Sequence, residues 1–234
     1  MQSLPFDPFM PSAGAELIVY LDIKSPYAFI AKDPTRALAR TFGVTVDWRP
    51  LTLDIPSYLG SAKLDKQGKV TQSKRSASQW SSVKYAYRDA RRYAGYQGYM
   101  LRGTEKIWDT TLAHIGFSWA KAQDEKVLMD YLDHVYERFW QRDFDAEDIA
   151  VVSQALAHAG ADVGGFEDFA VGPGLEEHAH NQAAIFAAGI FGVPSYILDG
   201  EVYFGREHLP TVSWILNGRR GPQPDISLAA GETG

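Results

Sequence analysis

Residues 17–29 read Leu-Ile-Val-Tyr-Leu-Asp-Ile-Lys-Ser-Pro-Tyr-Ala-Phe, and they join a strand signal to a helix-start signal. The run 17–22 is β-branched and aromatic with polar residues around it, which predicts a strand. Ser25 followed by Pro26 predicts the start of a helix, because serine caps free backbone amides and proline tolerates the first helical turn. We expect this helix to stop at Gly43.

The rest of the pattern places a long helical segment between two strand-bearing segments. A second strand is expected at 44–48. From about Pro56 to Gly174, apolar residues recur at spacings of three and four, which predicts helices that form a bundle with its own core. Asp199-Gly200 suits a two-residue hairpin turn. The two strands that it joins and the last helix are expected at 195–198, 202–204 and 206–216.

Composition indicates a globular chain without thiol chemistry of its own. The chain has 234 residues, of which 45% are hydrophobic and 22% charged, enough for one elaborated domain. Cysteine is absent, which excludes disulfides, thiolate metal sites, cysteine nucleophiles and any dithiol cycle. Any thiol that takes part in a reaction must therefore be borrowed.

The two ends are rich in polar and small residues, so 1–15 and 219–234 are predicted to be flexible tails. No run approaches the roughly 18 consecutive apolar residues that span a bilayer, and no basic patch followed by an apolar run opens the chain. We therefore expect a soluble cytoplasmic protein that does not bind membranes.

The charge is unevenly distributed. A net charge of -6 argues against nucleic-acid binding, which needs basic patches. Between Lys63 and Lys106, however, eleven Lys or Arg face three Asp or Glu. Such a segment suggests attraction for a small anion, although a solvated basic face is the commoner reason.

Two histidine-bearing stretches are candidate sites. His178 and His180 in Glu-Glu-His-Ala-His lie two residues apart, so they point to different helix faces and would not chelate a metal together. We predict no metal site and a solvent-facing helix there. His114, near an apolar face, is expected to be a core histidine with satisfied hydrogen bonds.

Two further stretches complete a family resemblance. The first, 189–196, reads Gly-Ile-Phe-Gly-Val-Pro-Ser-Tyr, and the second, 205–209, reads Gly-Arg-Glu-His-Leu. Together with 20–29 they resemble the DsbA-like proteins, and within them the 2-hydroxychromene-2-carboxylate isomerases and kappa-class glutathione transferases. The resemblance implies an α/β, thioredoxin-like fold with a large all-helical domain inserted between the second strand and the C-terminal half. The implied thioredoxin-like domain comprises 16–55 and 175–218, and the implied insertion comprises 56–174.

The resemblance also implies a glutathione site. Ser25 and Pro26 stand where oxidoreductases of the superfamily begin Cys-Pro-x-Cys, and the serine hydroxyl of the isomerases hydrogen-bonds the sulfur of glutathione. Independently of the family, a helix N-terminus offers unpaired amides that favour a thiolate. Val193, before a cis Pro194, would pair with the cysteinyl backbone.

The ending at 205–209 departs from the family's Gly-x-Asp-Arg-Leu. Arg206 and Glu207 would hold the γ-glutamyl end, and Glu207 keeps the family's negative charge with one more methylene. The implied function is a glutathione-dependent isomerase acting on an aromatic carboxylate. Glutathione conjugation and a non-catalytic thioredoxin-fold binding protein remain open alternatives, and relatives suggest a homodimer.

Overall fold

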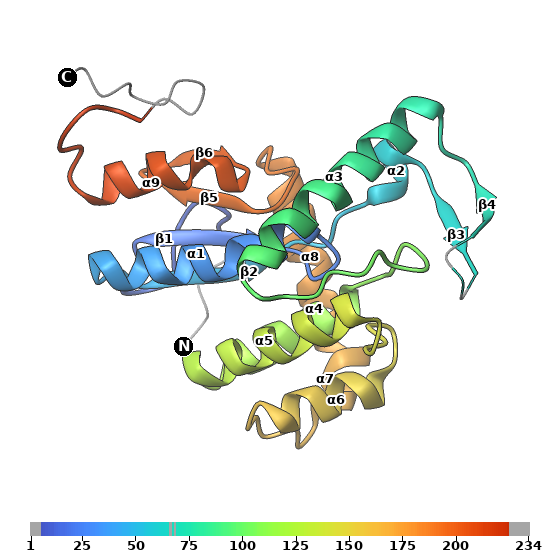
Figure 1. The fold of residues 1–234 in the computed structure, drawn as a ribbon. Helices are drawn as coiled ribbons and strands as arrows, with labels where there is room; N and C mark the ends of the chain where they lie inside the picture. Colours follow the sequence, from blue (N-terminus) through green and yellow to red (C-terminus); the bar gives the residue numbers. More distant parts are fainter. Residues whose placement is uncertain (1–5, 66, 68, 225–234) are drawn as a thin grey trace.

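The computed structural model describes residues 6–65, 67 and 69–224. A four-stranded sheet in the order β2-β1-β5-β6 lies at the centre (Figure 1). Its strands are β1 (Leu17–Leu21), β2 (Val46–Pro50), β5 (Ser195–Leu198) and β6 (Glu201–Phe204). β1 pairs in parallel with β2 and antiparallel with β5. Because every residue of β1 is buried, this strand lies at the heart of the core, and the expected α/β, thioredoxin-like arrangement is confirmed.

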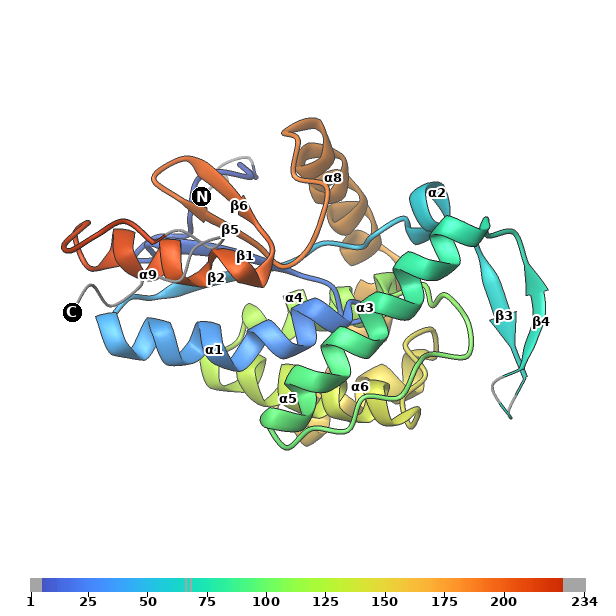
Figure 2. The same ribbon diagram turned by 45° about the horizontal axis from the view of Figure 1, so that its top comes forward.

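Helices α1 (Pro26–Phe42) and α9 (Leu209–Leu216) contact each other on one side of the sheet (Figures 1 and 2). α1 begins after its cap, Ser25, and ends at Gly43, whose φ of 66° lies in the left-handed region that glycine adopts without strain. The short helix η1 (Arg206–His208) precedes α9, and α8 (Pro173–Ala187) leads back towards β5.

The segment between β2 and α8 contains all the remaining helices of the described residues. They are α2 (Ile55–Leu59), α3 (Ala77–Tyr96), α4 (Thr111–Lys121), α5 (Glu125–Gln141), α6 (Ile149–His158) and α7 (Phe166–Val171). α3 packs along α1, and α4 contacts both β2 and α8. The buried apolar residues of the sheet and of these helices form one continuous core, whereas the sequence pattern predicted a separate core for the insertion.

The insertion also contains a hairpin, β3 (Ala62–Leu64) and β4 (Val70–Ser73), which the sequence did not predict. It projects away from the rest of the molecule in both views (Figures 1 and 2). All four residues of β4 are exposed, and it does not alternate between apolar and polar residues. β3 alternates over only three residues, fewer than the roughly four to eight that a strand signal requires.

The N-terminal residues that the structure describes are held against the sheet. The guanidinium of Arg49 donates to the carbonyl oxygens of Asp7 at 2.7 Å and Met10 at 2.6 Å. It also lies 5.0 Å from the ring centre of Phe6. Residues 6–15 therefore differ from the predicted flexible tail, because their partner on β2 is distant in sequence. Residues 1–5 and 225–234 of the predicted tails lie outside the described residues. Within the described residues, no helix is long and apolar enough to cross a membrane.

Candidate functional site

Strand register brings the predicted site residues to one end of the sheet. Ser195 pairs with Tyr20 near the end of β1, so Pro194 lies opposite the segment that leads to Ser25. The Val193–Pro194 peptide bond is cis. The amide of Gly205 donates to the carbonyl of Pro194 at 2.8 Å, which brings the start of η1 to the same place.

Ser25 caps α1 and is itself largely covered. Its Oγ accepts a hydrogen bond from the amide of Ala28 at 3.3 Å, and the residue is only 6% exposed. Within the described part of the chain, the Ser25 hydroxyl hydrogen has no acceptor and the amide of Tyr27 has no hydrogen-bond partner. Capping thus leaves two donors at the helix start that could serve an anion.

The turn before Ser25 is shaped by Asp22, which is fully buried. Its carboxylate accepts from the amide of Lys24 at 3.0 Å, from the Thr110 hydroxyl at 2.8 Å and from the amide of Leu53 at 2.8 Å. Its carbonyl oxygen accepts from the amide of Ser25 at 3.0 Å. Side chain and backbone of one residue therefore set the path of the chain into α1.

A buried polar chain continues from Asp22 towards α8. Nε2 of His114 lies 3.3 Å from Oδ1 of Asp22. The Thr52 hydroxyl lies 2.6 Å from Nδ1 of His114 and 3.0 Å from Nε2 of His178. Burial would raise the pKa of Asp22, but His114 and then Lys24 outweigh burial, so the pKa lies below its usual value.

The two histidines compare differently with the sequence predictions. His114 is a hydrogen-bonded core residue, as predicted. His178 was assigned to a solvent-facing helix, yet it is buried between α8 and the core. Burial first and the neighbouring His114 second lower the pKa of His178 to about 3. The sequence pattern missed this residue because the weakly amphipathic α8 does not show which face is covered.

A cavity of about 420 Å³ opens beside Ser25. Lys24 and Pro26, the two neighbours of Ser25, form part of its wall, and α3 contributes Trp80 and Tyr87. None of its described lining residues is acidic. Six of them are basic, namely Lys24, Arg75, Lys84, Arg91, Lys106 and Arg142.

Several of these cations have no acidic partner. Lys106 is paired with Glu147 at 2.6 Å. Arg75 and Lys84 instead lie 5.0 and 6.0 Å from the ring centre of Trp80. Neither of them, nor Arg91, has a carboxylate within ion-pair distance among the residues that the structure describes. The cavity therefore combines aromatic walls with uncompensated positive charge.

Arg206 and Glu207 lie close to this end of the sheet, without an ion pair between them. The guanidinium of Arg206 lies 3.5 Å from the ring centre of Tyr93 on α3. The exposed Glu207 folds over Gly205, where an added Cβ would lie 2.3 Å from its Oε2. A φ of 106° at Gly205 also requires glycine. The roles predicted for Arg206 and Glu207 stay predictions.

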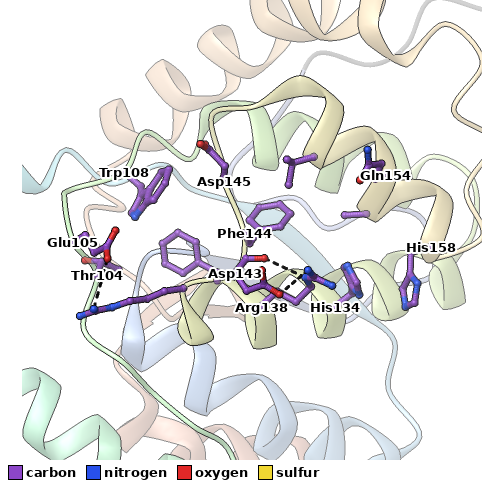
Figure 3. Close-up of a pocket in the computed structure, with 14 residues that line it drawn as sticks. Thr104, Glu105, Trp108, His134, Arg138, Asp143, Phe144, Asp145, Gln154 and His158 are labelled. Carbon is purple, nitrogen blue, oxygen red and sulfur yellow. Dashed lines mark hydrogen bonds and ion pairs between the residues drawn. The ribbon is translucent and has the colours of Figure 1, made fainter. Parts of the chain in front are cut away.

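A second cavity, of about 570 Å³, lies between α5 and α6 and contains none of the predicted site residues (Figure 3). It shares Thr104, Trp108 and Arg142 with the first cavity. Arg138, near its centre in Figure 3, is paired with Asp143 at 2.6 Å. Over residues 6–65, 67 and 69–224, no group of three or more His, Asp or Glu could hold a metal ion.

Comparison with known proteins identifies the family to which this fold belongs. The model of the DSBA-like thioredoxin domain matches residues 16–217. A curated 2-hydroxychromene-2-carboxylate isomerase from Sphingobium xenophagum is 24% identical over 204 residues, which cover 85% of this chain and 96% of that protein.

Solved structures agree on the fold. A 2-hydroxychromene-2-carboxylate isomerase superposes with a TM-score of 0.66 at 19% identity, covering 87% of this chain and 95% of that one. A probable DsbA oxidoreductase from Streptomyces coelicolor gives 0.64 at 20% identity, covering 93% and 97%. The cytosolic disulfide reductase DsbM from Pseudomonas aeruginosa, solved with GSH, gives 0.54 at 16% identity, covering 80% and 87%. Since the family model spans most of the sequence, the chain belongs to the DSBA-like thioredoxin domain family.

Proposed function

We propose that the protein is a glutathione-dependent isomerase of an aromatic carboxylate, similar to 2-hydroxychromene-2-carboxylate isomerase. The observation that carries this proposal is the cavity beside Ser25, whose walls are aromatic and basic with no acidic lining residue among those described. A planar aromatic acid matches both properties, because rings stack on Trp80 and Tyr87 while the carboxylate meets a cation.

The residues around Ser25 fit glutathione. The Ser25 hydroxyl and the amide of Tyr27 are donors at a helix N-terminus, which favours a nearby anion by about 0.3–2 kcal/mol. Val193 makes no backbone hydrogen bond in the part of the chain that the structure describes, so its amide and carbonyl are available to an extended peptide. When bound, glutathione would supply a thiolate that adds to a conjugated carbon of the substrate and later leaves unchanged.

The γ-glutamyl end of glutathione carries a carboxylate and an ammonium. Arg206 has no ion-pair partner among the described residues and could take the carboxylate, while the exposed Glu207 could take the ammonium. GSH in the structure of the Pseudomonas reductase supports a site of this kind in the fold. Pro26, which helps to line the aromatic cavity, would contact the cysteinyl part of glutathione beside the thiolate.

The absence of cysteine leads us to propose that the protein has no dithiol oxidoreductase activity. Conjugation, in which the thioether is released, and non-catalytic binding at the same proline are the alternatives. A cytoplasmic location and a homodimer are further proposals, and gel filtration would test the latter.

The test has two parts. Glutathione is titrated calorimetrically into wild type and Glu207→Gln, and 2-hydroxychromene-2-carboxylate is supplied with and without glutathione. We expect heat with wild type, weaker binding by the variant, and an isomeric product formed without loss of glutathione. Consumption of glutathione would indicate conjugation. No heat up to millimolar glutathione and no turnover would favour the binding protein.

A further inference from the structure

Lys24, the cation that directly precedes Ser25, lines the cavity beside that residue. The side chain of Lys24 is only 7% exposed, and it forms part of the wall together with Pro26 and Trp108. Lysine is rarely covered to this extent unless its charge is paired. The contacts of its ammonium group therefore indicate its role.

The ammonium of Lys24 has more N–H groups than there are hydrogen-bond acceptors around it. Nζ donates to the carbonyl oxygen of Trp108 at 3.2 Å. The nearest carboxylate oxygen, Oδ2 of Asp22, lies 3.7 Å away, beyond hydrogen-bond distance. Within the described residues no other acceptor contacts Nζ. Since an ammonium carries three N–H groups, at least one is left for whatever occupies the cavity.

Asp22 positions Lys24 and forms an ion pair with it, with Oδ2 lying 3.7 Å from Nζ. The Asp22 carboxylate accepts from the backbone amide of Lys24 at 3.0 Å, which fixes where the side chain starts. Its oxygens are otherwise engaged by Thr110 and by the amide of Leu53, at 2.8 Å each, and His114 lies beside it. The Lys24 side chain is thus held next to Ser25 as part of the cavity wall.

We propose that Lys24 is a catalytic residue that donates a hydrogen bond to the substrate's carbonyl oxygen as that oxygen becomes an enolate. For turnover, this inference rests on the proposed isomerase function. When the thiolate adds to the conjugated carbon, a C–S bond forms and the electron pair of the double bond moves to the carbonyl oxygen. Lys24 keeps its proton, and the electron pair returns when the thiolate leaves. A preorganised donor at the oxygen where charge develops is an effective form of transition-state stabilisation.

The other cavity cations are less suited to this role. Lys106 is paired with Glu147 at 2.6 Å, and Arg142 donates to the carbonyl of Gly103 at 2.6 Å. Arg75 and Lys84 flank the ring of Trp80 on α3. Arg75 and Lys84, which have no acidic partner among the described residues, are placed to attract a carboxylate, whereas Lys24 is the neighbour of Ser25 in the chain.

A binding experiment tests Lys24 without glutathione or turnover. The probe is 4-hydroxycoumarin, a bicyclic enolate at neutral pH, and uncharged coumarin is the matched neutral ligand. We expect Lys24→Met to lower the affinity for 4-hydroxycoumarin by about ten- to hundredfold, the range for a hydrogen bond to a charged group. The affinity for coumarin should fall by less than about twofold. Lys24→Arg keeps the charge and should recover much of the affinity. Lys126→Met, on the far exposed side of α5, is the control and should bind both ligands as wild type does. Equal loss for both ligands, or no loss for either, would overturn the proposal.

Kinetics separate this role from thiolate binding and from carboxylate binding. With 2-hydroxychromene-2-carboxylate, Lys24→Met should lower kcat by about a hundredfold, as when one oxyanion donor is removed, while KM changes little. The glutathione thiolate absorbance should stay as in wild type. A rise in KM alone, or loss of thiolate, would refute the enolate role. If wild type itself shows no turnover, the isomerase proposal falls, and the coumarin titration still decides whether Lys24 binds an enolate.

Discussion

Asp22 and His114 lie in contact in the core, with Oδ1 of the carboxylate 3.3 Å from Nε2 of the imidazole. Asp22 follows β1 and His114 belongs to α4, so the contact joins the sheet to the inserted helices. The same carboxylate accepts a hydrogen bond from the amide of Lys24. The backbone carbonyl of Asp22 accepts one from the amide of Ser25. The packing of the insertion and the geometry of the helix start are therefore coupled through one side chain.

Asp22→Asn should destabilise the fold by about 2–3 kcal/mol, because an amide cannot accept from all the donors that now face the carboxylate. Urea denaturation measures the change. The control, Asp143→Asn, alters an exposed carboxylate and should cost less than about 1 kcal/mol. Since the pKa of Asp22 is lowered on folding, its contribution is present above the ordinary Asp range and lost as pH falls below it. The gap between wild type and variant should shrink in acid, and a gap unchanged by acid would contradict this account.

Two variants separate the capping role of Ser25 from its proposed role in glutathione binding. Ser25→Ala loses the cap and should cost about 1 kcal/mol of stability, together with weaker glutathione binding. Ser25→Asp keeps a good capping residue but places negative charge where the thiolate is expected. We expect near-normal urea stability and no calorimetric heat with glutathione. If Ser25→Asp bound glutathione as wild type does, Ser25 would be a cap only.

The sequence predicted the parts of the fold whose signals are local. Ser25-Pro26 and Gly43 delimit α1 as expected. Asp199 and Gly200 both have positive φ, at 53° and 77°, as the two-residue hairpin turn requires. In each case the backbone preference of a few adjacent residues decides the conformation, so the sequence is sufficient.

The features of the fold and site that the sequence did not predict depend on contacts between distant segments. Thr52, His114 and His178 form one chain of hydrogen bonds, yet each alone is compatible with several environments. Likewise, nothing next to residues 6–15 indicates that Arg49 on β2 binds them. The cavity beside Ser25 also arises only when α2, α3 and the segment 103–108 come together. Local pattern cannot supply these arrangements, because packing chooses among them.

Two helical glycines should respond oppositely to alanine. In α4, a Cβ at Gly116 would lie 2.6 Å from the hydroxyl of Tyr131 and 2.8 Å from Val152, so it would displace the Tyr131 bond to the carbonyl of Ala113. Gly116→Ala should therefore cost about 1–3 kcal/mol, despite the better helix propensity of alanine. In α3, a Cβ at Gly95 meets nothing within 4 Å, so Gly95→Ala should be neutral or stabilise by up to about 1 kcal/mol. Thermal unfolding of both variants checks the contrast, and a stable Gly116→Ala would show that α4 and α5 can separate without loss.

His178 should make stability depend on pH in the mildly acidic range. Burial, then His114, lowers its pKa to about 3 in the folded protein, against about 6.5 in an unfolded chain. Between these values the unfolded state binds the extra proton. The free energy of unfolding therefore rises with pH up to about 6.5, and this group costs about 1.4 kcal/mol for each pH unit below that value. Above about 6.5 its contribution is constant.

His178→Gln removes the titration but keeps a polar side chain that can reach the Thr52 hydroxyl, which now lies 3.0 Å from Nε2. Urea unfolding at about pH 8 and about pH 5 should show that wild type loses about 2 kcal/mol more than the variant on acidification. His180→Gln changes an exposed histidine two residues further along the same helix, so it should keep the wild-type pH dependence. His134, whose pKa is also lowered by burial, contributes equally to all three proteins and cancels in the comparison. Equal acid sensitivity of wild type and His178→Gln would mean that His178 is not held neutral in the folded core.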